Sequence, residues 1–191
     1  MRGAVLVPVK AFSRAKERLA PCLDRPARAA LARAMASRVV AAAAPLPVAV
    51  VCDDAEVAAW ALNHGARVVW APGRGLDGAV VEGVAQLGAL GIERVVVAHA
   101  DLPLAAGLAP LAEGTGITLV PDRSEDGTNV AVVGTASGFR FSYGPGSFRR
   151  HRAEAARLGL PLLVVRPSEL TWDVDHPGDL DFPRPAPQTC G

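Results

Sequence analysis

The sequence has few cysteines, no long apolar segment and almost no net charge, and each shortage excludes a class of protein. No apolar run reaches the roughly 18 residues of a membrane-spanning helix. The three cysteines, Cys22, Cys52 and Cys190, lack the spacing of a zinc or redox motif. With no export signal at the N-terminus, they predict reduced thiols in a cytoplasmic protein. A net charge of +1 gives no general attraction to nucleic acid or to membrane surfaces.

Several catalytic and nucleotide-binding motifs are also missing. There is no GxxxxGK[ST] phosphate loop and no glycine fingerprint for a dinucleotide. No order or spacing suggests a Ser/His/Asp or Cys/His set, and His151 and His176 have no cysteine partner nearby for zinc. His99 ends an apolar run, which is typical of a core histidine with satisfied hydrogen bonds. A nucleotide site of another type remains open.

Strand and helix signals alternate through the first half of the chain. Strands are predicted over 4–9, 48–52, 66–70 and 94–98, and helices over 27–44, 53–63 and 76–90. This spacing predicts right-handed crossovers and a parallel sheet with helices on both faces. The fold class is therefore α/β.

The rhythm changes after residue 101. Strands at 117–120 and 129–133, joined by a polar loop, predict a small antiparallel excursion. A helix is predicted over 147–158 with Ser147 as its N-cap, followed by a strand over 162–165. We expect one domain over 1–183 and a proline-rich flexible tail over 184–191.

Asp101 follows a predicted buried strand that contains three consecutive valines, Val95–Val97, and Pro103 ends that strand. In open α/β sheets, ligands bind at the carboxyl ends of the strands. A lone carboxylate at that edge has no neighbouring cation in the sequence and needs a positively charged partner. This position therefore indicates a binding site for a divalent metal. The alternative is that Asp101 caps a helix beginning after Pro103.

Basic residues crowd the loop after the first strand. Of the 20 basic residues, only Lys10 and Lys16 are lysine, and both lie in this loop with Arg14 and Arg18. Compact ammonium groups and free backbone N–H groups suit a triphosphate. The alternative is a solvated basic face.

Asp173 and Asp175 alternate with Val174, so an extended backbone places both carboxylates on one side. Together with Asp101 they form a candidate Mg²⁺ site, because Mg²⁺ needs few carboxylates when phosphates and water complete its shell. The alternative is that one of the two acids caps a helix before Pro177.

Two further segments could hold an anion. Gly144, Ser147 and Arg149 lie around the start of the helix predicted at 147–158, where basic residues oppose the helix dipole and suggest a bound external anion. A solvated basic face is the alternative. The loop over 121–129 ends in Gly127, Thr128 and Asn129, which is typical either of a close backbone approach to a ligand or of an ordinary acidic turn.

Together these segments resemble the 2-phospho-L-lactate guanylyltransferase family of coenzyme F-420 biosynthesis, within the nucleotidyltransferase superfamily. The resemblance covers about residues 6–181. It rests on Val7-Pro8-Val9-Lys10 with Ala15-Lys16-Glu17-Arg18-Leu19, Asp101-Leu102-Pro103, Asp122-Arg123, Gly127-Thr128-Asn129, Gly144-Pro145-Gly146-Ser147-Phe148 with His151, and Asp173-Val174-Asp175.

The resemblance implies a Rossmann-like nucleotidyltransferase fold and an enzyme that transfers GMP from GTP to a phosphorylated three-carbon acid, releasing pyrophosphate. The acceptor is phosphoenolpyruvate or 2-phospho-L-lactate, with 3-phosphoglycerate as a further bacterial candidate, and a downstream F-420 ligase or transferase would take the product. The arginine and alanine bias of the chain indicates a GC-rich bacterial source. A bacterial source favours phosphoenolpyruvate as the acceptor.

From the residues and the resemblance, we assign Asp101 and Lys16 to catalysis and Asp101, Asp173 and Asp175 to Mg²⁺. The nucleotide would be held by Lys10, Arg14, Lys16, Arg18 and Asp77, and the acceptor by Thr128, Gly144, Ser147 and Arg149. Asp77 can accept hydrogen bonds from guanine or cap the helix over 76–90. The alternatives in function are a transferase for a molybdopterin or sugar-phosphate acceptor and a non-catalytic GTP-binding module.

Overall fold

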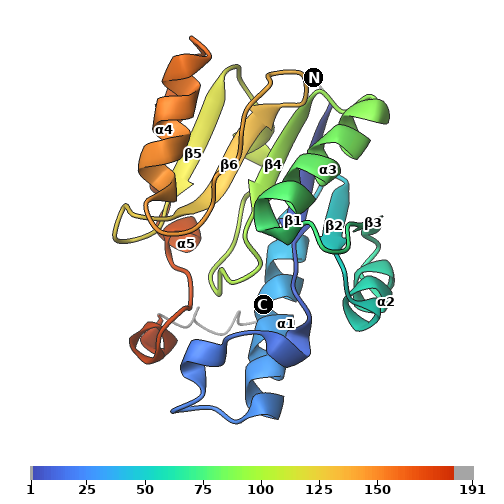
Figure 1. Ribbon diagram of the computed structural model, residues 1–191, viewed down its shortest axis with the longest axis vertical. Helices are drawn as coiled ribbons and strands as arrows, with labels where there is room; N and C mark the ends of the chain where they lie inside the picture. Colours follow the sequence, from blue (N-terminus) through green and yellow to red (C-terminus); the bar gives the residue numbers. More distant parts are fainter. Residues whose placement is uncertain (1, 183–191) are drawn as a thin grey trace, which may run out of the picture.

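The computed structural model describes residues 2–182, and a seven-stranded mixed sheet forms its centre (Figure 1). The strands are β1 Gly3–Pro8, β2 Val48–Cys52, β3 Arg67–Trp70, β4 Arg94–Ala98, β5 Ile117–Pro121, β6 Thr128–Gly134 and β7 Leu162–Val164. Their spatial order is β3-β2-β1-β4-β6-β5-β7. Strands β3, β2, β1 and β4 are parallel, whereas β6 runs antiparallel to β4 and β5. The predicted fold class and antiparallel excursion are confirmed.

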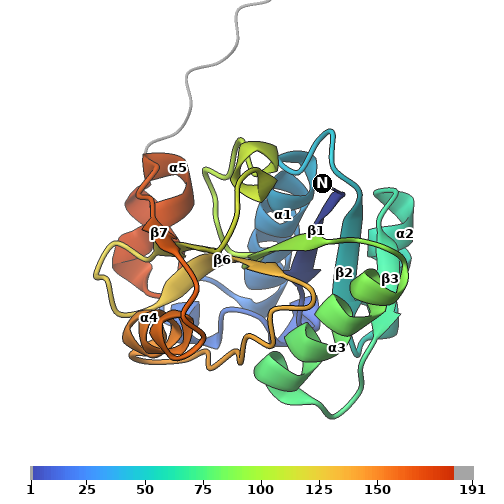
Figure 2. The ribbon, with the colours of Figure 1, turned by 90° about the horizontal axis from the view of Figure 1, so that it is seen from above.

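Helices cover both faces of the sheet. They are α1 Arg25–Ala41, α2 Ala55–Asn63, α3 Gly75–Ala89, α4 Ser147–Arg157 and α5 Ser168–Thr171. Figure 2 shows α1 and α5 on one side of the sheet and α3 and α4 on the other. Helix α2 packs on the same side as α1 through Val57 and Trp60. None of the helices within residues 2–182 is long and apolar enough to cross a bilayer.

Alternating side chains of the central strands supply both halves of the core. Val5 and Val7 of β1 pack toward α1, whereas Leu6 packs toward α3, and all three are fully buried. Gly83 lets α3 approach β1 closely, because a Cβ atom there would lie 2.6 Å from Cδ2 of Leu6. This contact sets the distance between α3 and the carboxyl end of β1.

Most predicted boundaries in the first half are correct to within three residues. Helix α1 begins at Arg25, two residues earlier than predicted, because the Asp24 side chain accepts a hydrogen bond from the Ala27 N–H. The sequence patterns did not predict α5 or four short helical turns. These turns are Phe12–Arg14, Glu17–Leu19, Ala109–Ala112 and Pro177–Asp181. Cys22 and Cys52 are free thiols. The predicted tail over 184–191, including Cys190, lies outside the described residues.

The predicted N-cap of α4 is wrong. Gly146 holds that position with φ 72°, in the left-handed region that suits glycine, and Ser147 is the first helical residue. Ser147 is almost fully buried, and its hydroxyl lies 3.4 Å from Oγ1 of Thr128 instead of capping the helix.

Candidate active site

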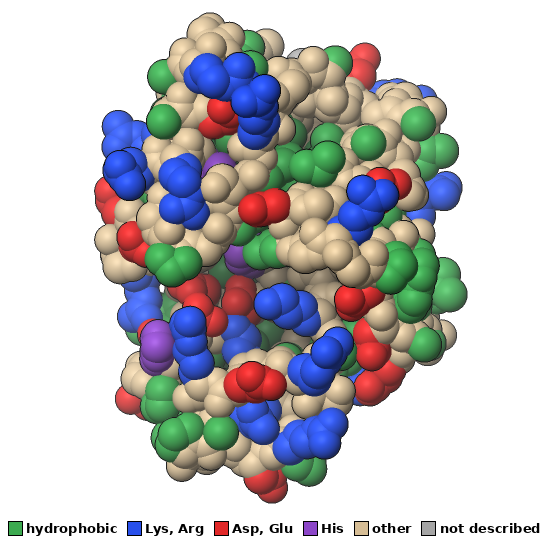
Figure 3. All heavy atoms as spheres, in the orientation of Figure 1, with side chains coloured by type: hydrophobic (Ala, Val, Ile, Leu, Met, Phe, Trp, Pro, Cys, Tyr) green, Lys and Arg blue, Asp and Glu red, His purple; other side chains and the backbone are tan. Residues whose placement is uncertain are grey.

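Two adjoining cavities lie past the carboxyl ends of β1, β2 and β4, the edge predicted to bind ligands. Their volumes are about 640 Å³ and about 610 Å³, within the usual range for small-molecule sites. Both cavities are lined by Arg18, His99, Asp101, Gly144 and Asp175. Figure 3 shows acidic and basic side chains gathered around a hollow in this face of the molecule. The arrangement suits two ligands that meet at shared residues.

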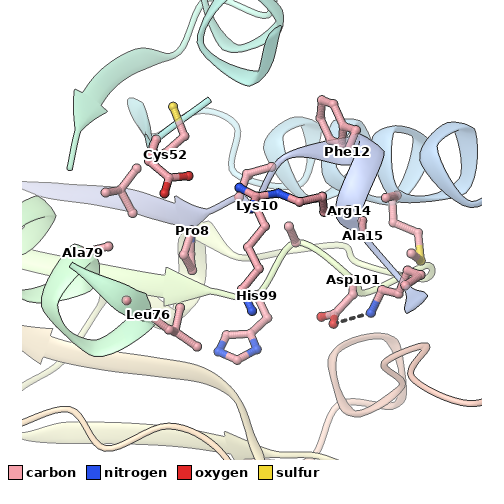
Figure 4. A pocket seen from close by; sticks show the side chains of 18 of the residues that line it. Pro8, Lys10, Phe12, Arg14, Ala15, Cys52, Leu76, Ala79, His99 and Asp101 are labelled. Carbon is pink, nitrogen blue, oxygen red and sulfur yellow. Dashed lines mark hydrogen bonds and ion pairs between the residues drawn. The ribbon is translucent and has the colours of Figure 1, made fainter. Parts of the chain in front are cut away.

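The larger cavity, which we call the first cavity, differs in character between its two ends. Lys10, Arg14, Lys16 and Arg18 line it from the loop after β1, as the sequence predicted. Small and apolar side chains line the other end, and Figure 4 shows Cys52, Leu76 and Ala79 lying away from Arg14 and Asp101, with Lys10 between. One end therefore suits phosphates and the other a flat, less charged group.

Lys16 bridges two of the predicted metal ligands. Its Nζ lies 2.7 Å from Oδ2 of Asp101 and 3.1 Å from Oδ1 of Asp175. Burial opposes the charged forms, but the ion pairs raise the pKa of Lys16 and lower that of Asp101. Lys16 also has φ 55°, an uncommon conformation for a residue with a Cβ atom. This backbone geometry aims the ammonium group at the carboxylates.

Asp173 and Asp175 flank a fully buried Val174, so both carboxylates leave the core on the same side, as predicted. The pKa of Asp173 rises to about 6, because it is partly buried and faces the negative charges of Asp101 and Asp175. The Val174 N–H donates to the Asp101 carbonyl at 3.2 Å, which ties the segment to the loop after β4. Asp101 and Asp175 thus line both cavities, and Asp173 lines the second cavity near them.

Neither capping alternative holds for these acids. No helix begins directly after Pro103; the next helical turn is Ala109–Ala112, and Leu108 holds its N-cap position, so Asp101 does not cap it. His176 holds the N-cap position before Pro177. The capping carboxylate is Asp179, which the sequence reasoning missed. Its Oδ2 accepts from the backbone N–H groups of Asp175 and His176 at 3.0 and 2.7 Å. Asp179 therefore positions the Asp175 backbone.

The three carboxylates fit a hard divalent cation only with ligands from outside the protein. Among the described residues, Oδ1 of Asp101 is buried without a hydrogen-bond partner. Within residues 2–182, no group of three His, Cys, Asp or Glu side chains is arranged to bind a metal by itself. Mg²⁺ matches this donor set, since it usually takes one or two carboxylates plus phosphates and water.

The second cavity is lined by Thr128, Gly144 and Ser147, three of the four residues predicted to hold the acceptor. The Asp122 carboxylate organises the loop that leads into β6, accepting from the Ser124 hydroxyl and the N–H groups of Asp126 and Gly127. The loop is therefore an acidic turn, one of the two sequence alternatives, and it borders the second cavity.

A carboxylate of the protein itself, that of Asp126, lies at the start of α4. The prediction that an external anion binds there is therefore corrected. Oδ2 of Asp126 accepts from the Gly146 N–H at 2.9 Å. The Arg150 guanidinium folds back onto the preceding loop, donating to Ser142 and to the Pro145 carbonyl. Arg149, predicted to hold the acceptor, is exposed and does not line either cavity.

Two other predictions change. Asp77 is not the N-cap of α3 and lines neither cavity; its Oδ1 accepts from the Tyr143 N–H at 2.8 Å. The residue with a carboxylate near the apolar end of the first cavity is Asp53, at the end of β2. The Nε2 atom of His99 is buried with no hydrogen-bond partner among the described residues, so this histidine is not the satisfied core residue that was expected.

Similarity to solved structures covers most of the chain and shows the fold. A protein of Desulfovibrio desulfuricans G20, named as a nucleotide-diphospho-sugar transferase, aligns with a TM-score of 0.77 at 19% identity, covering 94% of this chain and 85% of that one. A nucleotidyl transferase of Methanothermobacter aligns with a TM-score of 0.65 at 18% identity, covering 94% of each chain. The fold is that of the nucleotidyltransferases.

Curated relatives are similar over nearly their full length. Phosphoenolpyruvate guanylyltransferases of Sphaerobacter thermophilus and Streptomyces coelicolor are 35% and 38% identical, covering 95% and 94% of this chain and 92% and 89% of theirs. The family model described as guanylyl transferase CofC like matches residues 3–182. The chain belongs to this family of guanylyl transferases.

Proposed function

We propose that the protein transfers GMP from GTP to phosphoenolpyruvate and releases pyrophosphate, in the biosynthesis of coenzyme F-420. The observation that carries this proposal is the pair of cavities that share Asp101 and Asp175. Four cations lie toward one end of the first cavity, and hydroxyl and glycine residues lie among the carboxylates that line the second. Related proteins named phosphoenolpyruvate guanylyltransferase favour that acceptor over 2-phospho-L-lactate. Because both substrates are cytoplasmic metabolites, we place the reaction there.

The polarity of the first cavity orients the nucleotide. The triphosphate lies toward Lys10, Arg14, Lys16 and Arg18, and the base lies toward Leu76 and Ala79. Asp53, which follows Cys52 in the chain, brings a carboxylate to the lining of the first cavity. Its carboxylate suits guanine, which presents N1–H and an amino group as parallel donors, whereas adenine offers a lone pair at N1. We therefore assign guanine recognition to Asp53 instead of Asp77.

The acceptor lies in the second cavity, near Thr128, Gly144 and Ser147. Its phosphate oxygen attacks the α-phosphorus of GTP, a P–O bond forms, and the bond to the bridging oxygen of pyrophosphate breaks. A phosphate is already ionised near neutral pH, so the attacking group needs no general base. The protein contributes mainly position and charge, as in other phosphoryl transfers.

Asp101, Asp173 and Asp175 would hold Mg²⁺ at the junction of the cavities. When bound, the ion neutralises charge on the reacting phosphates and aligns them. Lys16 contacts two of these carboxylates and lines the nucleotide cavity. In the proposed complex its ammonium group supplies positive charge to the triphosphate from within this acidic cluster.

The test is pyrophosphate release from GTP and Mg²⁺ with phosphoenolpyruvate, 2-phospho-L-lactate and 3-phosphoglycerate in parallel, with the downstream F-420 transferase present to consume the product. Release that is fastest with phosphoenolpyruvate and abolished by a chelator supports the proposal. GTP binding without turnover on any of the three would contradict it, and would favour a different acceptor or a GTP-binding module. The Asp181→Asn variant, altered at an exposed carboxylate that lines neither cavity, serves as the control.

A further inference from the structure

His151 is buried beside the second cavity and has no part in the mechanism above. Its side chain is fully inaccessible and packs among the rings of Phe139, Phe141 and Tyr143. Burial, together with the positive charge of Arg150, lowers the pKa of His151 to about 4. The imidazole is therefore neutral at physiological pH, with one nitrogen protonated and the other a lone-pair acceptor.

The hydrogen bonds of His151 decide which nitrogen carries the proton. The Ser142 backbone N–H lies 2.9 Å from Nε2, and an amide N–H acts only as a donor, so Nε2 must accept. The proton of the neutral ring then resides on Nδ1. Oγ1 of Thr128 lies 3.0 Å from Nδ1 and accepts that proton in a hydrogen bond.

The tautomer also sets the direction of the next hydrogen bonds. The Thr128 and Ser147 hydroxyl oxygens lie 3.4 Å apart, a distance for a weak bond that uses one of their two protons. Because His151 donates to Thr128, it takes no proton from the pair, and the second proton remains for another acceptor. Thr128 and Ser147 both line the second cavity. With the opposite tautomer, Thr128 would donate to His151 and no proton would remain.

We infer that His151 is a positioning residue that keeps the Thr128–Ser147 pair as a hydrogen-bond donor toward an anionic group of the acceptor. This inference rests on the proposed function for the identity of that anion. The remaining hydroxyl proton meets a carboxylate or phosphate oxygen, and a fixed donor avoids the cost of reorienting the hydroxyl when the acceptor binds. The side chain of His151 itself touches no substrate.

The first experiment measures the tautomer directly, without any reaction. Long-range ¹H–¹⁵N correlation spectra of the uniformly ¹⁵N-labelled protein at pH 7 should show His151 protonated at Nδ1, with Nε2 at the shift of an unprotonated nitrogen. A spectrum showing the proton on Nε2, or rapid exchange between both forms, would overturn the inference while leaving the proposed function untouched.

The second experiment compares His151→Phe, which preserves bulk, with His151→Asn, whose amide places an N–H donor near the position of Nδ1. The phenylalanine variant should raise the KM for phosphoenolpyruvate about 10- to 100-fold, as expected for loss of a hydrogen bond to a charged group, with the KM for GTP within about twofold. The asparagine variant should recover part of that loss. Equal increases in both KM values for both variants would indicate general structural damage and overturn the inference.

A double-mutant cycle completes the test. In a Thr128→Val background the hydroxyl is absent, so His151→Phe should change the KM for phosphoenolpyruvate by less than about twofold. An undiminished effect in that background would show that His151 acts by another route. If wild-type protein releases pyrophosphate with none of the three acceptors, the proposed function fails, whereas the tautomer still reports on the hydrogen-bond direction.

Discussion

The two cavities are built in different ways from the same sheet. The first cavity takes its four cations from one segment, residues 10–18, at the end of β1. The second takes its lining from segments that lie far apart in sequence, around Thr128, Ser147 and Asp175. The parallel half of the sheet therefore presents its ligand groups locally, whereas the antiparallel half assembles them by long-range packing.

The arginines of the two halves show what this difference means for charge. Arg14 lines the first cavity and Arg18 lines both, whereas Arg150 is engaged by backbone and hydroxyl oxygens of the loop before α4. Arg123 lies over Trp172 and pairs with Asp179. The arginines on the nucleotide side are therefore available to a ligand. On the acceptor side, Arg150 and Arg123 contact groups of the protein itself and stabilise its loops.

Asp101 belongs to both cavities, so its removal should cause the largest loss. We expect Asp101→Ala to lower turnover by roughly 10²–10³ or more, by analogy with the loss of one preorganised contact to the transition state. Steady-state pyrophosphate release measures the change, and circular dichroism shows whether the variant folds. Full activity in a folded variant would show that Asp101 is not needed for catalysis.

Acid stability tests the acceptor side through its buried histidine, His151. His151 keeps a pKa of about 4 in the folded protein, whereas an unfolded histidine titrates near 6.5. Below pH 6.5 the unfolded state binds the proton and the folded state does not, so stability falls as pH falls toward 4. The expected loss from this residue is about 2 kcal/mol at pH 5 relative to pH 7.5.

Urea unfolding at the two pH values measures this loss, and His151→Phe provides the reference. The variant is less stable overall, but its stability should decrease by about 2 kcal/mol less between pH 7.5 and pH 5 than that of wild type. Parallel pH dependence in both proteins would mean that His151 titrates normally in the folded state.

Lys16 tests whether the two cavities have been assigned to the right ligands. The Lys16→Ala variant loses a charge from the nucleotide cavity, and we expect the KM for GTP to rise about tenfold or more, with a smaller change for the acceptor. Arg25→Ala, altered at an exposed arginine outside both linings, is the matched control. A larger effect on the acceptor than on GTP would mean that the two cavities are exchanged.

The same contrast explains how much the sequence predicts. Alternating β and α patterns predict the parallel half closely, because crossovers depend on local sequence. The observed caps Asp24 and Asp54 shift the starts of α1 and α2 by only two residues from the predicted ones. The loop cations and Asp101 follow from the rule that ligands bind where parallel strands end. These features need only local pattern and one general rule of topology.

The acceptor side required knowledge of distant contacts. Serine is preferred over glycine at helix N-caps, so the sequence favoured Ser147. Gly146 caps α4 instead, because Asp126, about twenty residues earlier, accepts a hydrogen bond from its N–H. Nothing in the sequence shows that Arg150 folds back while Arg149 stays exposed. The hydrogen bonds of His151 likewise join β6, α4 and the loop between them, so its role was not predictable from spacing.

Substitutions of Asp53 and Asp77 should have the smallest effect on activity, but they test guanine recognition most directly. Both carboxylates lie near the base end of the first cavity, and only Asp53 lines it. Inosine triphosphate lacks the guanine amino group, so wild type should prefer GTP. Asp53→Asn keeps one acceptor oxygen but loses its charge, which should reduce that preference in kcat/KM by about three- to tenfold. Asp77→Asn should leave the preference unchanged, because its carboxylate contacts the Tyr143 backbone instead of a ligand. The opposite pattern would return guanine recognition to Asp77 and show that α3 shifts when the nucleotide binds.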